Sequence, residues 1–101
     1  MIPVDITPKA LAEIKHIINH KNIPEDYGLR IGVRGGGGCS VAGMNYMLGF
    51  DKRKATDKQF EVDGITIYIE KSHFMYIIGT RVVFVNDSEQ RGFVFEKVNA
   101  S

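Results

Sequence analysis

The dipeptide Asp63-Gly64 lies between two short segments, 60–62 and 65–69, in which apolar residues alternate with other residue types. Alternation with a period of two residues is typical of a β-strand that buries one face. An Asp-Gly pair between two such segments is the strongest short-range signal for a tight β-hairpin. We therefore expect paired antiparallel strands here, and this hairpin favours a fold built from short strands.

Other parts of the chain show the same strand pattern or a short interruption of it. Between Lys71 and Ile78 the apolar residues lose the two-residue period, which predicts a short helical turn closed by Gly79-Thr80. The remaining strands are expected at 29–34, 44–50, 81–85 and 92–98.

The N-terminal segment has the pattern of an amphipathic helix. Thr7 is a suitable N-cap, and Pro8 suits the first helical position because a proline there loses no hydrogen bond. Apolar residues then recur at helical spacing at Leu11, Ile14 and Ile18. We expect a helix that starts at Pro8 and ends near Asn22.

One helix and about six short strands predict a mainly β (α+β) fold, with a mostly antiparallel sheet and the helix packed on one face or end. No part of the sequence has the pattern of a parallel βαβ unit. The 101 residues are expected to form a single domain, 1–101, because they lack a linker or a repeat and are too few for two cores.

The charge balance and hydropathy argue against two classes of partner. Thirteen Lys and Arg against twelve Asp and Glu leave a net charge of +1, too little for binding nucleic acid by charge alone. No segment reaches the roughly 18 apolar residues of a membrane span, and the N-terminus lacks a signal-peptide pattern. We therefore expect no nucleic-acid or membrane partner, and a cytoplasmic location.

The single cysteine, Cys39, follows the run Gly35 to Gly38. One thiol excludes an intrachain disulfide and a four-thiolate metal site within one chain. The glycines match no phosphate-binding motif, because a strand rather than a helix is expected next. They indicate either a flexible tip or a backbone that closely approaches a bound group. Cys39 is accordingly either a small buried apolar side chain or a reactive or metal-binding thiol.

The three histidines are weaker candidates than Cys39 for a metal ligand. His16 and His20 are four residues apart, with Glu13 nearby, a spacing that can chelate a metal but is also common on exposed helix faces. For His73 we favour a partly buried, hydrogen-bonded side chain over a ligand. No base for Cys39 can be named, so we do not expect an enzyme.

The aromatic residues are expected in the core: Tyr46, Phe50, Tyr68, Phe74, Tyr76, Phe84, Phe93 and Phe95.

Taken in order and spacing, several motifs resemble the A-type iron-sulfur carrier family, also called HesB-like or IscA-like iron-sulfur cluster assembly accessory proteins. The resemblance covers nearly the whole chain. The matching segments are Ile6-Thr7-Pro8-Lys9-Ala10, 29–33, Gly36 to Cys39, Val62-Asp63-Gly64-Ile65, Tyr76-Ile77-Ile78-Gly79-Thr80 and 92–95.

This resemblance implies a compact HesB-like β sandwich or open barrel with the N-terminal helix alongside, and association into homodimers or larger homo-oligomers. It also implies binding of iron or of an iron-sulfur cluster, such as [2Fe-2S], and delivery to apo-proteins. Of the family's three cysteine ligands, only the first has a counterpart, Cys39, in a loop with Gly36, Gly37 and Gly38. The tail motif Cys-Gly-Cys has none, because the sequence stops at Ser101.

Two functional hypotheses follow. In the first, the protein carries iron or a labile cluster through Cys39, and its partners are apo iron-sulfur proteins or cluster scaffold proteins. A [2Fe-2S] cluster needs four ligands, so two copies of Cys39 would require a thiol co-ligand such as glutathione or ligands from a partner. In the second, a degenerate HesB-like module binds proteins and carries no cluster.

Overall fold

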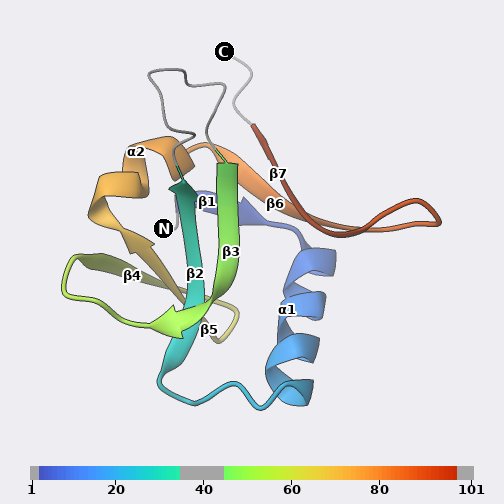
Figure 1. Ribbon diagram of the computed structural model, residues 1–101, viewed down its shortest axis with the longest axis horizontal. Coiled ribbons are helices and arrows are strands. Elements are labelled where there is room, and N and C mark those ends of the chain that lie inside the picture. The colour runs from blue at the N-terminus through green and yellow to red at the C-terminus, as the bar shows by residue number, and fades with distance from the viewer. Residues whose placement is uncertain (1–2, 35–44, 98–101) are drawn as a thin grey trace.

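The computed structural model describes residues 3–34 and 45–97, and these residues form two small β-sheets with one long helix beside them (Figure 1). The elements, in chain order, are β1 (Val4–Ile6), α1 (Pro8–His20), β2 (Tyr27–Arg34), β3 (Asn45–Lys52), β4 (Asp57–Val62), β5 (Ile65–Glu70), the 3-10 turn η2 (Lys71–His73), α2 (Phe74–Ile77), β6 (Thr80–Asn86) and β7 (Arg91–Lys97). The predicted mainly β class is confirmed.

The strand pairing is antiparallel only in part. One sheet has the order β3-β2-β5-β4 and the other the order β1-β6-β7. The pairs β2–β3, β4–β5 and β6–β7 are antiparallel, as expected, but β2–β5 and β1–β6 are parallel. Both parallel pairs join strands that are distant in the sequence. The two-residue period shows which face of a strand is buried and contains no information about the direction of a distant partner.

The core lies between the two sheets and α1 (Figure 1). Ala10 and Ile14 of α1 are fully buried there, and β2, β5 and β6 contribute Ile31, Ile67 and Val82. The apolar spacing that predicted the helix is therefore the spacing of its buried face. None of the helices in the described residues is long and apolar enough to cross a membrane.

The beginning of α1 is as predicted. The Thr7 hydroxyl accepts a hydrogen bond of 3.2 Å from the backbone N–H of Ala10, and Pro8 occupies the first helical position. This bond satisfies one of the N–H groups that the first turn of a helix leaves without a partner. The helix ends at His20, and Asn22 follows in a left-handed conformation with φ 53°.

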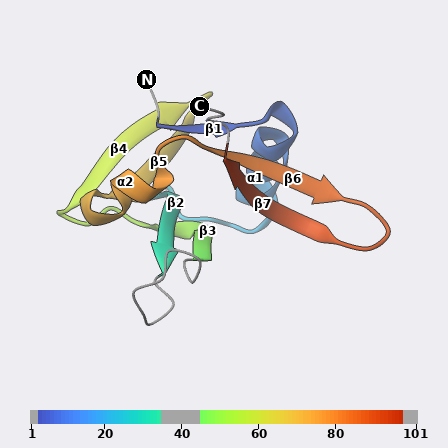
Figure 2. The same ribbon diagram turned by 90° about the horizontal axis from the view of Figure 1, so that it is seen from above.

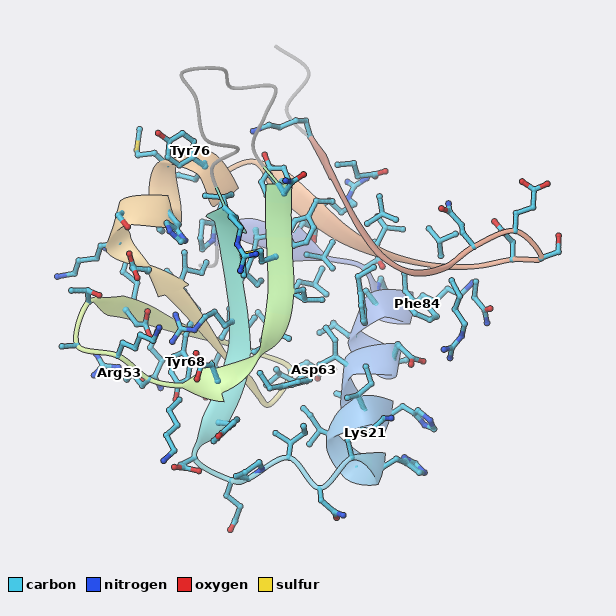
Figure 3. All side chains as sticks on the ribbon, in the orientation of Figure 1. Lys21, Arg53, Asp63, Tyr68, Tyr76 and Phe84 are labelled. Carbon is cyan, nitrogen blue, oxygen red and sulfur yellow. The ribbon has the colours of Figure 1, made fainter. Side chains whose placement is uncertain are left out.

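The hairpin around Asp63-Gly64 is also confirmed. Asp63 and Gly64 both have positive φ, 52° and 84°, and the strands on either side pair from Val62 with Ile65 onward. Two consecutive positive φ values match the right-handed twist of the strands in a two-residue turn. The Asp63 carboxylate lies 2.5 Å from Nζ of Lys15 on α1. The turn therefore lies against the helix, as Figure 3 also shows.

Strand β1 was not predicted, because three residues are too few to show a period. Its Val4 and Ile6 are buried, Asp5 is exposed, and it pairs with the first half of β6. The β6–β7 hairpin extends beyond the rest of the molecule in Figure 2. Phe84 and Phe93 pack across it with ring centroids 5.1 Å apart. Strand β1 therefore completes the smaller sheet beside β6.

Candidate functional site

The predicted site residues Cys39, Gly36, Gly37 and Gly38 lie outside the described residues. What the structure places is the pair of strands on either side of them. β2 and β3 pair from Tyr27 with Lys52 to Arg34 with Asn45. Because Arg34 and Asn45 are register partners, the segment 35–44 leaves and re-enters the sheet at neighbouring positions. In the sequence, the antiparallel β2–β3 pair therefore flanks the segment that contains Cys39.

An aromatic contact joins the start of β3 to the other sheet. The rings of Tyr46 and Phe95 stack with centroids 4.9 Å apart, and the Tyr46 hydroxyl donates a 3.4 Å hydrogen bond to the carbonyl of Tyr76. Tyr76 is 43% exposed, so its prediction as a core residue is wrong. It lies at the same end of the molecule as the end of β2 and the start of β3 (Figure 3). Both sheets and α2 thus meet at the start of β3.

His73 contacts the end of β2 from the turn η2. Its Nδ1 accepts a hydrogen bond of 3.3 Å from the backbone N–H of Val33, and its Nε2 lies 3.9 Å from Oε2 of Glu70. An imidazole that accepts at Nδ1 and is neutral has its proton on Nε2. Nδ1 is thus occupied by the N–H of Val33, whereas Nε2 lies too far from Glu70 for a hydrogen bond. The prediction of a partly buried, hydrogen-bonded His73 is confirmed.

The two helical histidines do not contribute to this region. His16 and His20 are exposed on α1 and stack on each other with ring centroids 4.0 Å apart. Nδ1 of His20 lies 2.8 Å from the carbonyl oxygen of His16. Within residues 3–34 and 45–97, no three His, Cys, Asp or Glu side chains are grouped closely enough to hold a metal ion. Among the described residues, His16 and His20 therefore have no third side chain with which to bind a metal ion.

A cleft of about 320 Å³ lies on the face of the larger sheet that points away from the core. Arg30 and Gly32 of β2 and Met47 and Asp51 of β3 line it, and Glu70 and His73 form one side. Gly32 is next to the hydrogen-bonded Val33, so the cleft extends along β2 to the end that leads toward Cys39. The sequence did not predict this cleft, because its walls come from three distant segments.

A buried ion pair that begins at Arg30 of this cleft was also not predicted. Arg30 donates two hydrogen bonds, of 2.8 and 2.6 Å, to the carboxylate of Asp57, whose side chain is fully buried. Its Nε donates a third bond, of 3.2 Å, to Asp51. The hydrogen bond from Arg30 holds the pKa of Asp57 below its ordinary value, and the backbone N–H of Lys52 does the same for the pKa of Asp51. One sequence signal existed: Arg30 is a charged residue between the apolar Leu29 and Ile31.

Tyr68 belongs to the same face. It is buried, but under the guanidinium of Arg30, whose Cζ lies 5.9 Å from the ring centroid. Tyr68 and Arg30 are register partners on β5 and β2. The prediction that Tyr68 is buried is confirmed, although it faces away from the main core. Together Arg30, Asp57 and Tyr68 connect three strands of the larger sheet.

Comparison with known proteins agrees with this architecture. The family model described as iron-sulphur cluster biosynthesis matches residues 2–101. A mouse protein, iron-sulfur cluster assembly 1 homolog, mitochondrial, is 36% identical over 95 residues, which cover 93% of this chain and 70% of the relative. The crystal structure of Escherichia coli SufA, involved in biosynthesis of iron-sulfur clusters, superposes with a TM-score of 0.71 at 25% identity and covers 93% of this chain and 84% of that one.

A second solved structure is IscA with the [2Fe-2S] cluster. It has a TM-score of 0.69 at 29% identity, and the match covers 97% of this chain and 85% of that one. The fold defines a HesB-like domain, and the chain belongs to the iron-sulphur cluster biosynthesis family. The family resemblance that the sequence motifs indicated is confirmed.

Proposed function

We propose that this protein is an A-type carrier that holds iron or a labile iron-sulfur cluster as cargo through Cys39 and delivers it to apo-proteins. The family membership supports the proposal. The observation that carries it is the position of Cys39 in the sequence, between two strands whose ends are register partners. A thiolate is the side-chain group that iron-sulfur clusters take as ligand.

The number of available ligands predicts weak binding. A [2Fe-2S] cluster takes four ligands, and the sequence contains one cysteine. Two copies of the chain supply two thiolates, so the other positions would be taken by a small thiol such as glutathione or by the partner protein. Nδ1 of His73 already accepts the N–H of Val33, so this nitrogen is not available to fill one of them. Labile binding suits a protein that passes its cargo on.

Two further parts of the proposal concern assembly and location. We propose a homodimer, because two copies of Cys39 place two thiolates at one cluster. We also propose a cytoplasmic location, where glutathione keeps thiols reduced and Cys39 free to bind. Mass measurement by light scattering on the apo and the loaded protein tests the first part. A monomer in both states would contradict it.

Anaerobic reconstitution with iron, sulfide and glutathione tests the carrier role. The wild type is expected to develop the visible absorbance of a cluster, and Cys39→Ser is expected to remain colourless. Ser40→Ala, at the next position in the sequence, is the matched control and should behave like the wild type. Transfer is then measured as the gain of cluster by an apo-ferredoxin in the presence of a chelator.

The second candidate function is a protein-interaction module without a cluster, and the single cysteine is the observation that favours it. In that case the wild type stays colourless with and without glutathione, and Cys39→Ser binds the same protein partners as the wild type. A chromophore of equal intensity in wild type and Cys39→Ser would show that Cys39 is not the ligand.

A further inference from the structure

We propose that His16 and His20, exposed on the last turns of α1, form a binding site for one divalent transition-metal ion of the group Ni²⁺, Cu²⁺ and Zn²⁺. The two imidazoles supply two ligands, and water or a donor from outside the chain completes the coordination. The site is independent of Cys39 and of the cargo role. It is built on one helix, all of whose residues the structure describes.

The spacing on the helix brings the two rings together. α1 runs from Pro8 to His20 without interruption, and residues four positions apart lie one above the other on the same face of a helix. The rings of His16 and His20 stack with centroids 4.0 Å apart. Two nitrogens that share one ion lie at most about 4.2 Å apart, since each metal–nitrogen bond is about 2.1 Å long. The helix therefore holds the two imidazoles at a separation that suits a shared ion.

A hydrogen bond leaves Nε2 of His20 available as a ligand. Nδ1 of His20 lies 2.8 Å from the carbonyl oxygen of His16. A carbonyl oxygen only accepts, so Nδ1 carries the hydrogen, and Nε2 of the uncharged ring keeps its lone pair. Metal-bound histidines almost always donate their other ring N–H in this way, to a carboxylate, a backbone carbonyl or water. The contact thus gives His20 the tautomer of an imidazole that binds a metal through Nε2.

The surroundings of the two rings suit a bound cation. Because His16 and His20 are exposed, each ring can turn about its side-chain bonds and direct Nε2 at a shared ion. His20 is the last residue of α1, where the partial negative charge of a helix C-terminus stabilises a cation. Glu13, one turn earlier than His16, lies 3.6 Å from Arg91 and is engaged there. We therefore expect two protein ligands only, in agreement with the grouping of side chains in the described residues.

The type and number of ligands decide which ions bind and how firmly. Imidazole suits Ni²⁺, Cu²⁺ and Zn²⁺, whereas Mg²⁺ and Ca²⁺ take oxygen ligands. A structural zinc site surrounds its ion with four protein ligands, so a site with two leaves positions open to exchange. We expect a labile surface site rather than a structural one.

Nickel is the probe for the direct test, because Ni²⁺, unlike Cu²⁺, does not oxidise the thiol of Cys39. Ni²⁺ is added stepwise to the full chain while the backbone amides are observed by NMR, and paramagnetic broadening should first remove the signals of residues 16–21. Isothermal titration calorimetry on the same protein measures the dissociation constant. His16→Ala and His20→Ala should each weaken binding about tenfold or more, since two linked ligands hold one ion more tightly than either alone.

Two double variants test the spacing and keep the number of histidines. His20→Gln with Lys21→His moves the second imidazole one residue along the chain, about 100° around the helix axis, and should bind as weakly as His20→Ala. His20→Gln with Ala12→His rebuilds the four-residue spacing one turn earlier, at another exposed position, and should regain most of the affinity. Circular dichroism checks that each variant keeps its helix. Equal affinities of the two double variants overturn the proposal.

Two single variants locate the bound ion. His73→Asn removes the third histidine of the sequence and should bind Ni²⁺ on α1 like the wild type. Cys39→Ser removes the thiol and should leave the broadening of residues 16–21 unchanged. Broadening that begins elsewhere in the chain, or a dissociation constant that His16→Ala and His20→Ala leave unaltered, overturns the proposal. None of these measurements involves cluster reconstitution, so the carrier role can fail while the histidine site stands, and the reverse.

Discussion

Arg30 on β2 and Asp57 at the start of β4 share two hydrogen bonds across the outer face of the larger sheet, although β2 and β4 are separated by β5. The Asp57 side chain is fully buried, and its carboxylate also accepts a 2.7 Å bond from the backbone N–H of Lys54. A buried carboxylate tolerates its charge only when it is paired and hydrogen-bonded. This pair connects β2, which leads toward Cys39, to the far edge of the sheet.

Removal of the guanidinium should therefore destabilise the protein strongly. Arg30→Met leaves the Asp57 carboxylate buried without its partner, and we expect a loss of about 3 kcal/mol in the free energy of unfolding. Urea unfolding followed by circular dichroism measures it. Lys52→Met is the matched control: Lys52 pairs with Asp26 at 4.0 Å between two exposed side chains and should cost less than about 0.5 kcal/mol. Equal costs for the two variants would contradict the importance of the buried pair.

The same pair predicts how stability depends on acid. Contacts with Arg30 and the backbone N–H of Lys54 lower the pKa of Asp57 from its ordinary 3.8. A carboxyl group with a lowered pKa in the folded state stabilises the fold above its unfolded pKa and loses this contribution as the pH falls through its folded pKa. The free energy of unfolding should therefore decrease below about pH 4. Asp57→Asn should show a shallower decrease than the wild type, measured by urea unfolding at a series of pH values.

The turn between β4 and β5 should be sensitive to a side chain at Gly64. Its φ of 84° is disfavoured for other residues, while a Cβ atom there would meet nothing within 4 Å. Gly64→Ala should thus cost about 1 kcal/mol through the backbone alone. Gly49 is the control, because it also has open space around a Cβ atom but no positive φ in the left-handed region. Thermal unfolding should show Gly49→Ala as stable as the wild type or slightly more so; a matching loss there would refute the backbone explanation.

The N-cap of α1 should contribute measurably to stability. Thr7→Ala removes the acceptor for the Ala10 N–H and should lower the free energy of unfolding by about 1 kcal/mol. Thr7→Ser retains the hydroxyl and should remain close to the wild type. Chemical unfolding of both variants checks this difference. If serine and alanine cost the same, the hydroxyl does not act as the cap.

Local patterns in the sequence were sufficient for much of the fold. The start of α1, the hairpin at Asp63-Gly64 and the short turn after β5 depend on residues within a few positions of each other, so the sequence alone predicts them. The family resemblance came from the same kind of evidence, motifs in a fixed order. Strand β1 and the parallel pairings with β5 and β6 were not predicted, since they depend on partners far along the chain.

For the candidate site, too, some features follow from local sequence and others depend on residues far apart along the chain. The sequence by itself determined that the chain has one thiol, Cys39, that glycines precede it, and that strands lie on either side. Only the tertiary structure decided that His73 contacts the end of β2 and that Arg30 reaches Asp57. The reason is physical: hydrogen bonds and ion pairs act over a few ångströms in space. Gly32 and His73, or Arg30 and Asp57, come within that range only after β5 and η2 have packed beside β2.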